Sequence, residues 1–210
     1  MIKKAFLFLG FGLVVCIPLF LRFCSVNHFD IPLYYQEKAP VNVACDQVDA
    51  PYSVRDAGII NLMDSSQLIL NDIQGKKVIA ILKDETDHMQ IMNEAVRMLD
   101  KFYDLNSVSG IFIFSDSNDY KKSGSIAGIM SGHQIMYGGV TRDKLQNFID
   151  CKLFIPQNPV EGDTIWNGVL LDDLNRIRGY YDLQLVDETD RLSAEIKVLL
   201  REEKLKENEK

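Results

Sequence analysis

The sequence predicts an α/β domain with a central mixed sheet flanked by helices. Residues 78–82 (VIAIL) and 108–114 (VSGIFIF) are short apolar runs, as expected for strands that are covered on both faces. Residues 86–103, between them, have a helical period instead. Strands that alternate with helices in this way favour a sheet with parallel crossovers.

The residues that precede these strands and this helix are typical of a linker followed by a hairpin. Residues 25–50 contain two prolines and no clear period, so we expect a linker that lies against the domain. Residues 58–60 and 68–70 are apolar and flank a polar turn at 64–67. This pattern is typical of a β-hairpin at the start of a domain, which we place at 51–203.

The helix predicted at 86–103 has one apolar stripe. Thr86 or Asp87 can cap its first turn. The stripe repeats at steps of three and four residues and consists of Met92, Ala95, Val96, Leu99, Phe102 and Tyr103. We therefore expect one face of this helix to pack on the sheet.

The middle of the chain predicts one further strand and one further helix. Residues 115–132 and 155–164 are rich in loop-forming residues. Between them, 133–137 is a short candidate strand, and Thr141 is a candidate cap for a helix that carries Leu145, Phe148 and Ile149.

The last part of the chain predicts a second hairpin and a closing helix. Residues 166–171 and 176–181 read as strands, and Asp172-Asp-Leu-Asn between them is typical of a solvated turn. The helix should start near Asp187 or Thr189, with an apolar face of Val186, Leu192, Ile196 and Leu199. The charged chain from Arg201 is expected to fray, and 204–210 form a tail.

The N-terminus predicts a membrane anchor at 1–24. Lys3 and Lys4 precede an uncharged apolar run of 17 residues, which is the short end of a membrane span. The leading lysines favour a single pass with the domain on the extracytoplasmic side of the cell membrane. A cleaved signal peptide, or a lipid anchor at Cys16 or Cys24, remains an alternative.

Charge argues against one class of partner. The formal net charge is −7, and beyond the anchor 20 Lys and Arg face 30 Asp and Glu. An acidic domain repels phosphate backbones, so we do not expect nucleic-acid binding.

The soluble part has two cysteines, Cys45 and Cys151, which are not in a CxxC or CxxxC motif. Neither therefore reads as a redox centre. We favour two independent buried thiols, and a disulfide is the alternative because the compartment would permit one.

The order of the elements, closed by a hairpin and a helix, is the thioredoxin-like arrangement. Several stretches also resemble the Sco/SenC family of membrane-anchored, thioredoxin-like copper chaperones for cytochrome c oxidase assembly. VLLDDLNRIRGYYD (169–182) is similar to the terminal hairpin of that family, and DIQGK (72–76) to its D-x-x-G-K. Thr141-Arg-Asp-Lys and the helix from Asp190 resemble further elements of it.

The resemblance implies copper ligands that this chain lacks. The family binds copper through a CxxxC at the strand-to-helix turn and a histidine that would fall near Thr164. The phase of the helix places His88 and Met92 where the cysteines would lie. Imidazole and thioether are both copper ligands, so these two residues are our candidate metal site. We otherwise expect no cofactor.

Three functions remain open. The first is a non-catalytic accessory protein that binds a protein partner in copper handling or oxidase assembly. The second is a copper carrier that uses His88 and Met92. The third is a thioredoxin-like interaction module without any link to copper. Thiol oxidoreductase activity is not expected, because such activity needs a reactive thiolate at the turn.

Overall fold

The computed structural model describes residues 31–38, 45, 48–55, 58–83, 88–102, 107–115, 134–155 and 165–208. Residues 31–210 form one compact unit. The predicted anchor at 1–24 lies outside the described residues. Within the described ranges, no helix has both the length and the apolar character that a membrane span requires.

The unit is built on a mixed sheet of seven strands in the order β2-β1-β5-β4-β3-β6-β7. The central strands β3, β4 and β5 are parallel, and the remaining pairs are antiparallel. The predicted mixed sheet and both predicted hairpins are therefore confirmed. The strands are β1 (Ile59–Asn61), β2 (Gln67–Leu68), β3 (Lys76–Leu82), β4 (Val108–Phe114), β5 (Gln134–Gly139), β6 (Gly168–Leu171) and β7 (Ile177–Tyr181).

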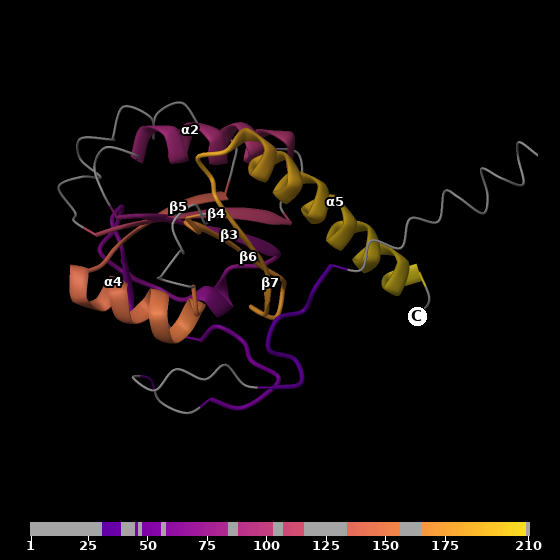
Figure 1. The fold of residues 1–210 in the computed structure, drawn as a ribbon, viewed down its shortest axis with the longest axis horizontal. Helices are drawn as coiled ribbons and strands as arrows, with labels where there is room; N and C mark the ends of the chain where they lie inside the picture. The colour runs from indigo at the N-terminus through magenta and orange to yellow at the C-terminus, as the bar shows by residue number, and fades with distance from the viewer. Residues whose placement is uncertain are drawn as a thin grey trace, which may run out of the picture. The chain divides into compact units, whose positions relative to one another are not determined.

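Helices cover both faces of this sheet (Figure 1). Helices α2 (His88–Leu99) and α5 (Val186–Asn208) lie on one face, and α4 (Arg142–Phe148) lies on the other. Short helical turns follow two of them: a 3-10 turn at Asp100–Phe102 and a π-helix at Ile149–Leu153. The result is a three-layer α/β unit with two cores.

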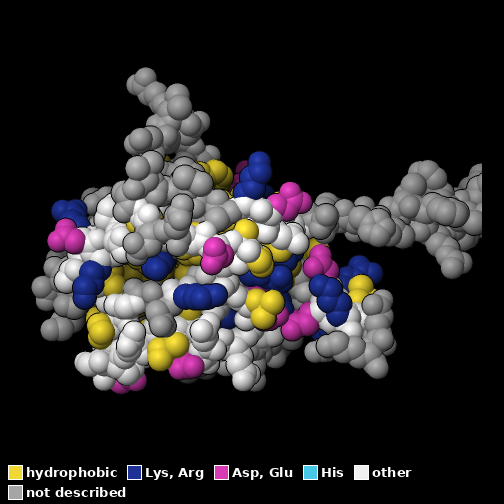
Figure 2. All heavy atoms as spheres, turned by 90° about the horizontal axis from the view of Figure 1, so that it is seen from below, with side chains coloured by type: hydrophobic (Ala, Val, Ile, Leu, Met, Phe, Trp, Pro, Cys, Tyr) yellow, Lys and Arg dark blue, Asp and Glu magenta, His cyan; other side chains and the backbone are white. Residues whose placement is uncertain are grey.

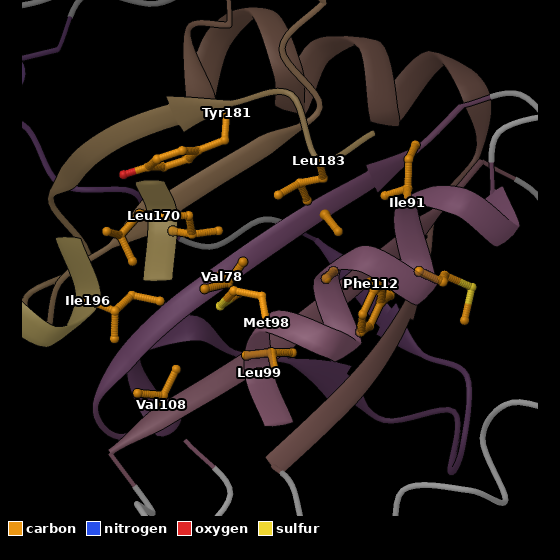
Figure 3. Packing of buried hydrophobic residues seen from close by; sticks show 14 of the residues in the cluster. Val78, Ile91, Met98, Leu99, Val108, Phe112, Leu170, Tyr181, Leu183 and Ile196 are labelled. Carbon is orange, nitrogen blue, oxygen red and sulfur yellow. The ribbon is translucent and has the colours of Figure 1, made fainter. Parts of the chain in front are cut away.

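The central strand β3 contributes to both cores. Val78, Ala80 and Leu82 pack beneath α2 and α5 (Figure 3), whereas Ile79 and Ile81 pack on the side of α4. Successive side chains of a strand point to opposite faces, so a strand with two covered faces must be apolar throughout. This accounts for the unbroken apolar run in the sequence.

The strand begins earlier than the sequence pattern indicates, with two buried lysines. Lys76 Nζ pairs with Asp173 Oδ2 at 2.7 Å and with Glu203 of α5. Lys77 Nζ donates to the carbonyl of Gly75 at 3.0 Å. Burial lowers the pKa of Lys77, an effect that Asp173 and Asp172 partly offset.

The stripe predicted for α2 is largely confirmed. Met92, Ala95, Leu99 and Phe102 are buried, while Val96 is only partly buried. The sequence reading omitted Ile91 and Met98, which are both buried. The buried face is therefore wider than the predicted stripe, because α5 packs beside α2 over the same face of the sheet.

Helix α5 differs from its prediction at both ends. Val186 is 51% exposed, because Leu183, just before the helix, occupies the adjoining core. Thr189 is buried on the inner face together with Leu192, Ile196 and Leu199. The helix also continues to Asn208 instead of fraying from Arg201, since Glu203 is held by Lys76.

The N-terminal cap predicted for α4 is wrong in one respect. Thr141 occupies the cap position with an extended backbone, but its side chain makes no capping hydrogen bond. The backbone carbonyl of Thr141 still accepts from the amide of Leu145 at 2.8 Å. The position was predictable from sequence, whereas the orientation of the hydroxyl was not.

The linker folds back onto the domain and is joined to it covalently. Cys45 and Cys151 form a disulfide with a Cα–Cα distance of 5.4 Å, so the expectation of two independent thiols is wrong. Tyr52, just after the linker, donates from its hydroxyl to the carbonyl of Lys152 at 2.8 Å. Burial raises the pKa of Tyr52 to about 12, which keeps this donor protonated.

The start of the linker also covers one edge of the sheet. The amide of Tyr34 donates to the carbonyl of Ile177 in β7 at 3.1 Å, and Ile31 is buried in the core. Edge strands expose unpaired amides and carbonyls that invite association with other chains. Because this segment occupies part of the β7 edge, it makes that part unavailable to other chains.

Candidate functional site

The first feature of the candidate site is His88, the first described residue of α2. The helix follows the carboxyl end of β3, and residues 84–87 of the connecting turn lie outside the described residues. His88 is only 3% exposed. Its ring meets the ring of Phe114 edge to face, with centroids 5.7 Å apart and planes at 89°. The imidazole is therefore packed as a buried side chain.

One nitrogen of His88 lacks a hydrogen-bond partner in the part of the chain that the structure describes. Its Nε2 atom is buried and has no hydrogen-bond partner among the described residues. A buried polar atom without a partner is costly, and such atoms call for a structural or functional explanation. This nitrogen is therefore a polar atom at the start of α2 that could still bind a ligand.

Met92, the second predicted metal ligand, belongs to the core. It is 1% exposed and packs in the cluster under α2 and α5. His88 and Met92 are four residues apart on one helix, so they share a face. Across the described ranges, no cluster of three or more His, Cys, Asp or Glu side chains could hold a metal ion. These residues thus offer two donors, which is a poor fit to a tightly bound copper ion.

Beside the start of α2 lies a small, mainly isoleucine-lined depression. Its volume is about 120 Å³. It collects side chains from the end of β3, from α2, from the π-helix and from the segment before β6. The described residues that line it are Ile81, Lys83, Ile91, Ile149, Ile155, Ile165, Trp166, Asn167 and Gln184.

Exposed apolar side chains occur at this depression and on the segments next to it. Ile165 is 62% exposed, Met89 49% and Leu185 50%. The Gln90 side-chain amide donates to the carbonyl of Gln184 at 3.0 Å, which brings the neighbours Met89 and Leu185 to the same end of the sheet. We define the junction surface as Met89, Ile165, Trp166 and Leu185.

Hydrogen bonds join the segment before β6, which carries Ile165, to the segment between β7 and α5, which carries Leu185. The side-chain carbonyl of Asn167 accepts from the amide of Leu183 at 2.6 Å, and both residues are buried. The carboxylate of Asp182 accepts from the amide of Gln184 at 3.0 Å. The segments that carry Ile165 and Leu185 are thereby fixed to one another, so the surface is organised in advance of any contact.

Ion pairs fix α2 against α5 on the solvent side. Arg97 donates to the hydroxyl of Thr189 at 2.8 Å and to Asp190 at 3.3 Å. Lys101 donates to the same Asp190 carboxylate at 2.8 Å, and this bond holds the pKa of Asp190 below its usual range. Exposed pairs of this kind contribute little stability individually, but they set the position of α2.

The sequence reading identified His88 and missed the rest of the junction surface. Ile165 and Leu185 stand outside any predicted strand or helix, and Trp166 was read as the first residue of the strand at 166–171, which begins at Gly168 in the structure. The only signal for Ile165 and Leu185 was an apolar residue outside the predicted elements. The turn acids Asp172 and Asp173 lie in the hairpin, but the prediction of a solvated turn is wrong for Asp172. This residue is buried, because its carboxylate accepts from the amides of Leu174 and Arg176, each at 3.0 Å.

Comparisons with known proteins give the fold. No protein-family model and no curated protein matches the chain. Among solved structures, a proposed protein disulfide isomerase from Bacteroides thetaiotaomicron is 16% identical, with a TM-score of 0.51 over 73% of this chain and 91% of that one. Copper-bound ScoI from Arabidopsis thaliana is 11% identical, with a TM-score of 0.47 over 74% and 99% of the two chains.

A bacterioferritin comigratory protein from Xanthomonas campestris is 15% identical, with a TM-score of 0.49 over 71% of this chain and 98% of that one. Of these three structures, only the Bacteroides protein exceeds a TM-score of 0.5. At such identities a likeness shows the fold alone. The chain therefore has a thioredoxin-like fold.

Proposed function

We propose that this protein is a membrane-tethered, non-catalytic accessory protein that binds a protein partner through the junction surface. The observation that carries the proposal is the exposure of Ile165 at an apolar depression and of Met89 and Leu185 on the segments next to it. Exposed apolar patches of this kind mark interaction sites in soluble domains. Trp166 adds an aromatic side chain, and aromatic side chains often dominate interface energies.

The chemistry of the same junction supports a binding role over a redox role. Members of the family that the chain resembles carry CxxxC here, whereas 83–92 reads KDETDHMQIM without a thiol. Thiol–disulfide exchange needs an accessible thiolate. The cysteines Cys45 and Cys151 are paired with one another, and neither is among the described residues that line the depression.

The proposed location rests on two independent features. Lys3 and Lys4 precede an apolar run that is long enough for a membrane anchor, which would place the domain outside the cytoplasm. The Cys45–Cys151 disulfide supports an oxidising compartment. Together with the hairpin at 169–182, which resembles the Sco/SenC family, these features suggest copper handling or cytochrome c oxidase assembly as the setting.

A site-specific photocrosslink tests the partner surface. We expect a photoreactive amino acid at Ile165 of the full chain, expressed in its native membrane, to form a protein adduct. The same amino acid at Leu174, which is 64% exposed in the turn between β6 and β7, should form none. Leu185→Asp should reduce the adduct at position 165 by about tenfold, because a charge replaces an apolar contact of hot-spot size.

The identity of the crosslinked protein separates the remaining alternatives. An oxidase subunit or a copper protein supports the accessory role in assembly. A partner unrelated to copper favours a general thioredoxin-like interaction module. Equal adducts at 165 and 174, or none at 165, would rule out the junction surface as the binding site.

Copper carriage by His88 and Met92 is a second candidate, which one observation favours. The unpartnered Nε2 of His88 is a potential ligand atom four residues from a thioether on the same helix. Against it, Met92 is buried in the core, and a methionine in such a place ordinarily serves packing. Copper would be the cargo of such a carrier, and the described residues contain no group of three or more His, Cys, Asp or Glu side chains that could hold it.

Titration of the full chain with Cu(I) against a competing chelator decides this candidate. We expect no binding tighter than about micromolar, because two donors without a third rarely hold copper. His88→Ala and Met92→Leu are the matched variants, and both should behave as the parent protein does. Submicromolar binding that His88→Ala abolishes would replace the accessory role by copper carriage.

A further inference from the structure

The disulfide between Cys45 and Cys151 joins the linker to an unusual helical turn. Cys151 is the middle residue of the π-helix Ile149–Leu153. Turns of this kind are rare, and they occur frequently at functional sites. Both cysteines are only half-buried, so the bond between them is not sealed inside the domain.

The two segments that the disulfide joins contain strained backbone. Phe154, which ends the π-helix, has a φ of 52°, and Tyr35 of the linker has a φ of 57°. Bulky residues are outliers at positive φ, and they persist there only where surrounding contacts enforce the conformation. The ring centroids of Tyr35 and Tyr52 lie 5.6 Å and 5.2 Å from that of Phe154. The disulfide and these ring contacts therefore restrain the same turn.

The π-helix also forms one wall of the depression at the junction surface. Ile149 and Ile155, at its two ends, both line the depression, and the amide of Ile155 donates to the carbonyl of Ile149 at 3.1 Å. The hydroxyl of Tyr180 donates to the carbonyl of Leu153 at 2.7 Å, and the ring of Tyr180 lies 6.5 Å from that of Trp166. Coupling between sites is carried by such chains of packed and hydrogen-bonded side chains. A change in the turn therefore reaches the junction surface through direct contacts.

A hollow next to Lys152, the residue after Cys151, offers an approach to the bond. Its volume is about 220 Å³. The described residues that line it are Val48, Asp49, Pro51, Tyr52, Ser53, Arg55 and Lys152. The attacking group in disulfide exchange is a thiolate, and two cations against one acid in this lining favour its approach. Figure 2 shows the face that carries α4, where Lys and Arg side chains lie among hydrophobic ones.

We propose that the Cys45–Cys151 disulfide is a redox-sensitive switch that controls the shape of the junction surface. A thiolate of a dithiol attacks one sulfur, which releases the other cysteine as a thiol and leaves a mixed disulfide. The second thiol of the dithiol then releases the first cysteine, so the dithiol becomes a disulfide and two electrons and two protons pass to the protein. The freed turn relaxes at Phe154, and Ile149 and Ile155 move with it. The use of this switch in partner binding rests on the proposed function.

Acrylamide quenching of fluorescence tests the switch, because Trp166 is the only tryptophan of the chain. The full chain is used in phosphatidylcholine vesicles, with and without dithiothreitol as the dithiol. We expect reduction to raise the quenching constant about twofold, since the wall of the depression loosens, and reoxidation to restore it. Cys16→Ser/Cys24→Ser should respond as the parent protein does. Cys45→Ser/Cys151→Ser should show the higher constant with or without the dithiol.

Two variants at Phe154 test the source of the response. Phe154→Asn and Phe154→Leu both remove the ring, but asparagine tolerates a positive φ and leucine does not. Phe154→Asn should therefore respond less to reduction than Phe154→Leu, and equal responses would overturn the inference. The far-UV circular dichroism of the parent should survive reduction. Its loss, or an unchanged quenching constant in folded reduced protein, would equally overturn the switch.

The photocrosslink at position 165 separates this inference from the proposed function. In the full chain in its native membrane, Cys45→Ser/Cys151→Ser should weaken the adduct about threefold, because the depression loses its preformed shape. A response of Trp166 to reduction without any adduct in the parent would remove the partner surface and keep the switch. An adduct in the parent with an unchanged Trp166 signal would keep the partner surface and remove the switch.

Discussion

Replacing both Cys45 and Cys151 by serine should lower the free energy of unfolding by about 4 kcal/mol. The disulfide joins residues 106 positions apart, so it removes much of the freedom of the unfolded chain. It also holds the linker where Tyr52 donates to Lys152, so its loss weakens that contact as well. Urea denaturation of parent and variant, followed by circular dichroism, measures the difference.

The N-terminal cysteines provide the control for this experiment. Cys16→Ser/Cys24→Ser removes the same number of thiols from the predicted anchor and should leave the unfolding midpoint unchanged. Reduction of the parent protein should reproduce the loss seen in the Cys45→Ser/Cys151→Ser variant. If removal of the disulfide changed the free energy of unfolding by less than about 1 kcal/mol, the unfolded chain would gain little conformational freedom from its loss.

Replacing Asp172 by alanine should lower the free energy of unfolding by about 3 kcal/mol. Its carboxylate is 7% exposed and accepts from the amides of Leu174 and Arg176. It also lies 3.6 Å from Nη1 of Arg178, whose side chain is 10% exposed. Alanine would leave that buried guanidinium without its countercharge, and removing one partner of a buried pair is strongly destabilising.

Two further variants identify the cause of that loss. Asp172→Ala/Arg178→Met should recover most of the stability, since the buried Arg178 guanidinium is then removed together with its countercharge. Asp64→Ala removes the acid of the other hairpin turn, where the carboxylate accepts from the amide of Ser66 at 2.9 Å in an exposed setting, and should change stability little. Equal losses for Asp64→Ala and Asp172→Ala would show that turn geometry, and not the buried charge, is responsible.

The strands and helices were predictable where a periodic pattern repeats over several residues. β3 and β4 were recognisable because strands covered on both faces must be apolar throughout. The face of α2 was recognisable because Met92, Ala95 and Leu99 recur at helical steps. Prediction failed where a single residue lacks such repetition, as at Val186, whose exposure depends on the place that Leu183 takes in the core.

The candidate site was predictable only in part, for the same reason. Helix phase pointed to His88 and Met92, and the structure places both on the buried side of α2. Helix phase could not reveal that the segments carrying Ile165, Trp166 and Leu185 lie near the start of α2. These segments are far from α2 in the chain, and no local spacing relates them to it.

The α/β class, the order of strands and helices, and the absence of a thiol between β3 and α2 can all be read from the amino-acid sequence. Each of these properties is local, because burial on a regular element imposes its period on neighbouring residues. That Cys45 meets Cys151, that Asp172 lies beside Arg178, and that Leu62 packs over Gly139 became apparent only from the folded arrangement. Such encounters depend on how distant segments pack, and the period of a strand or helix carries no information about them.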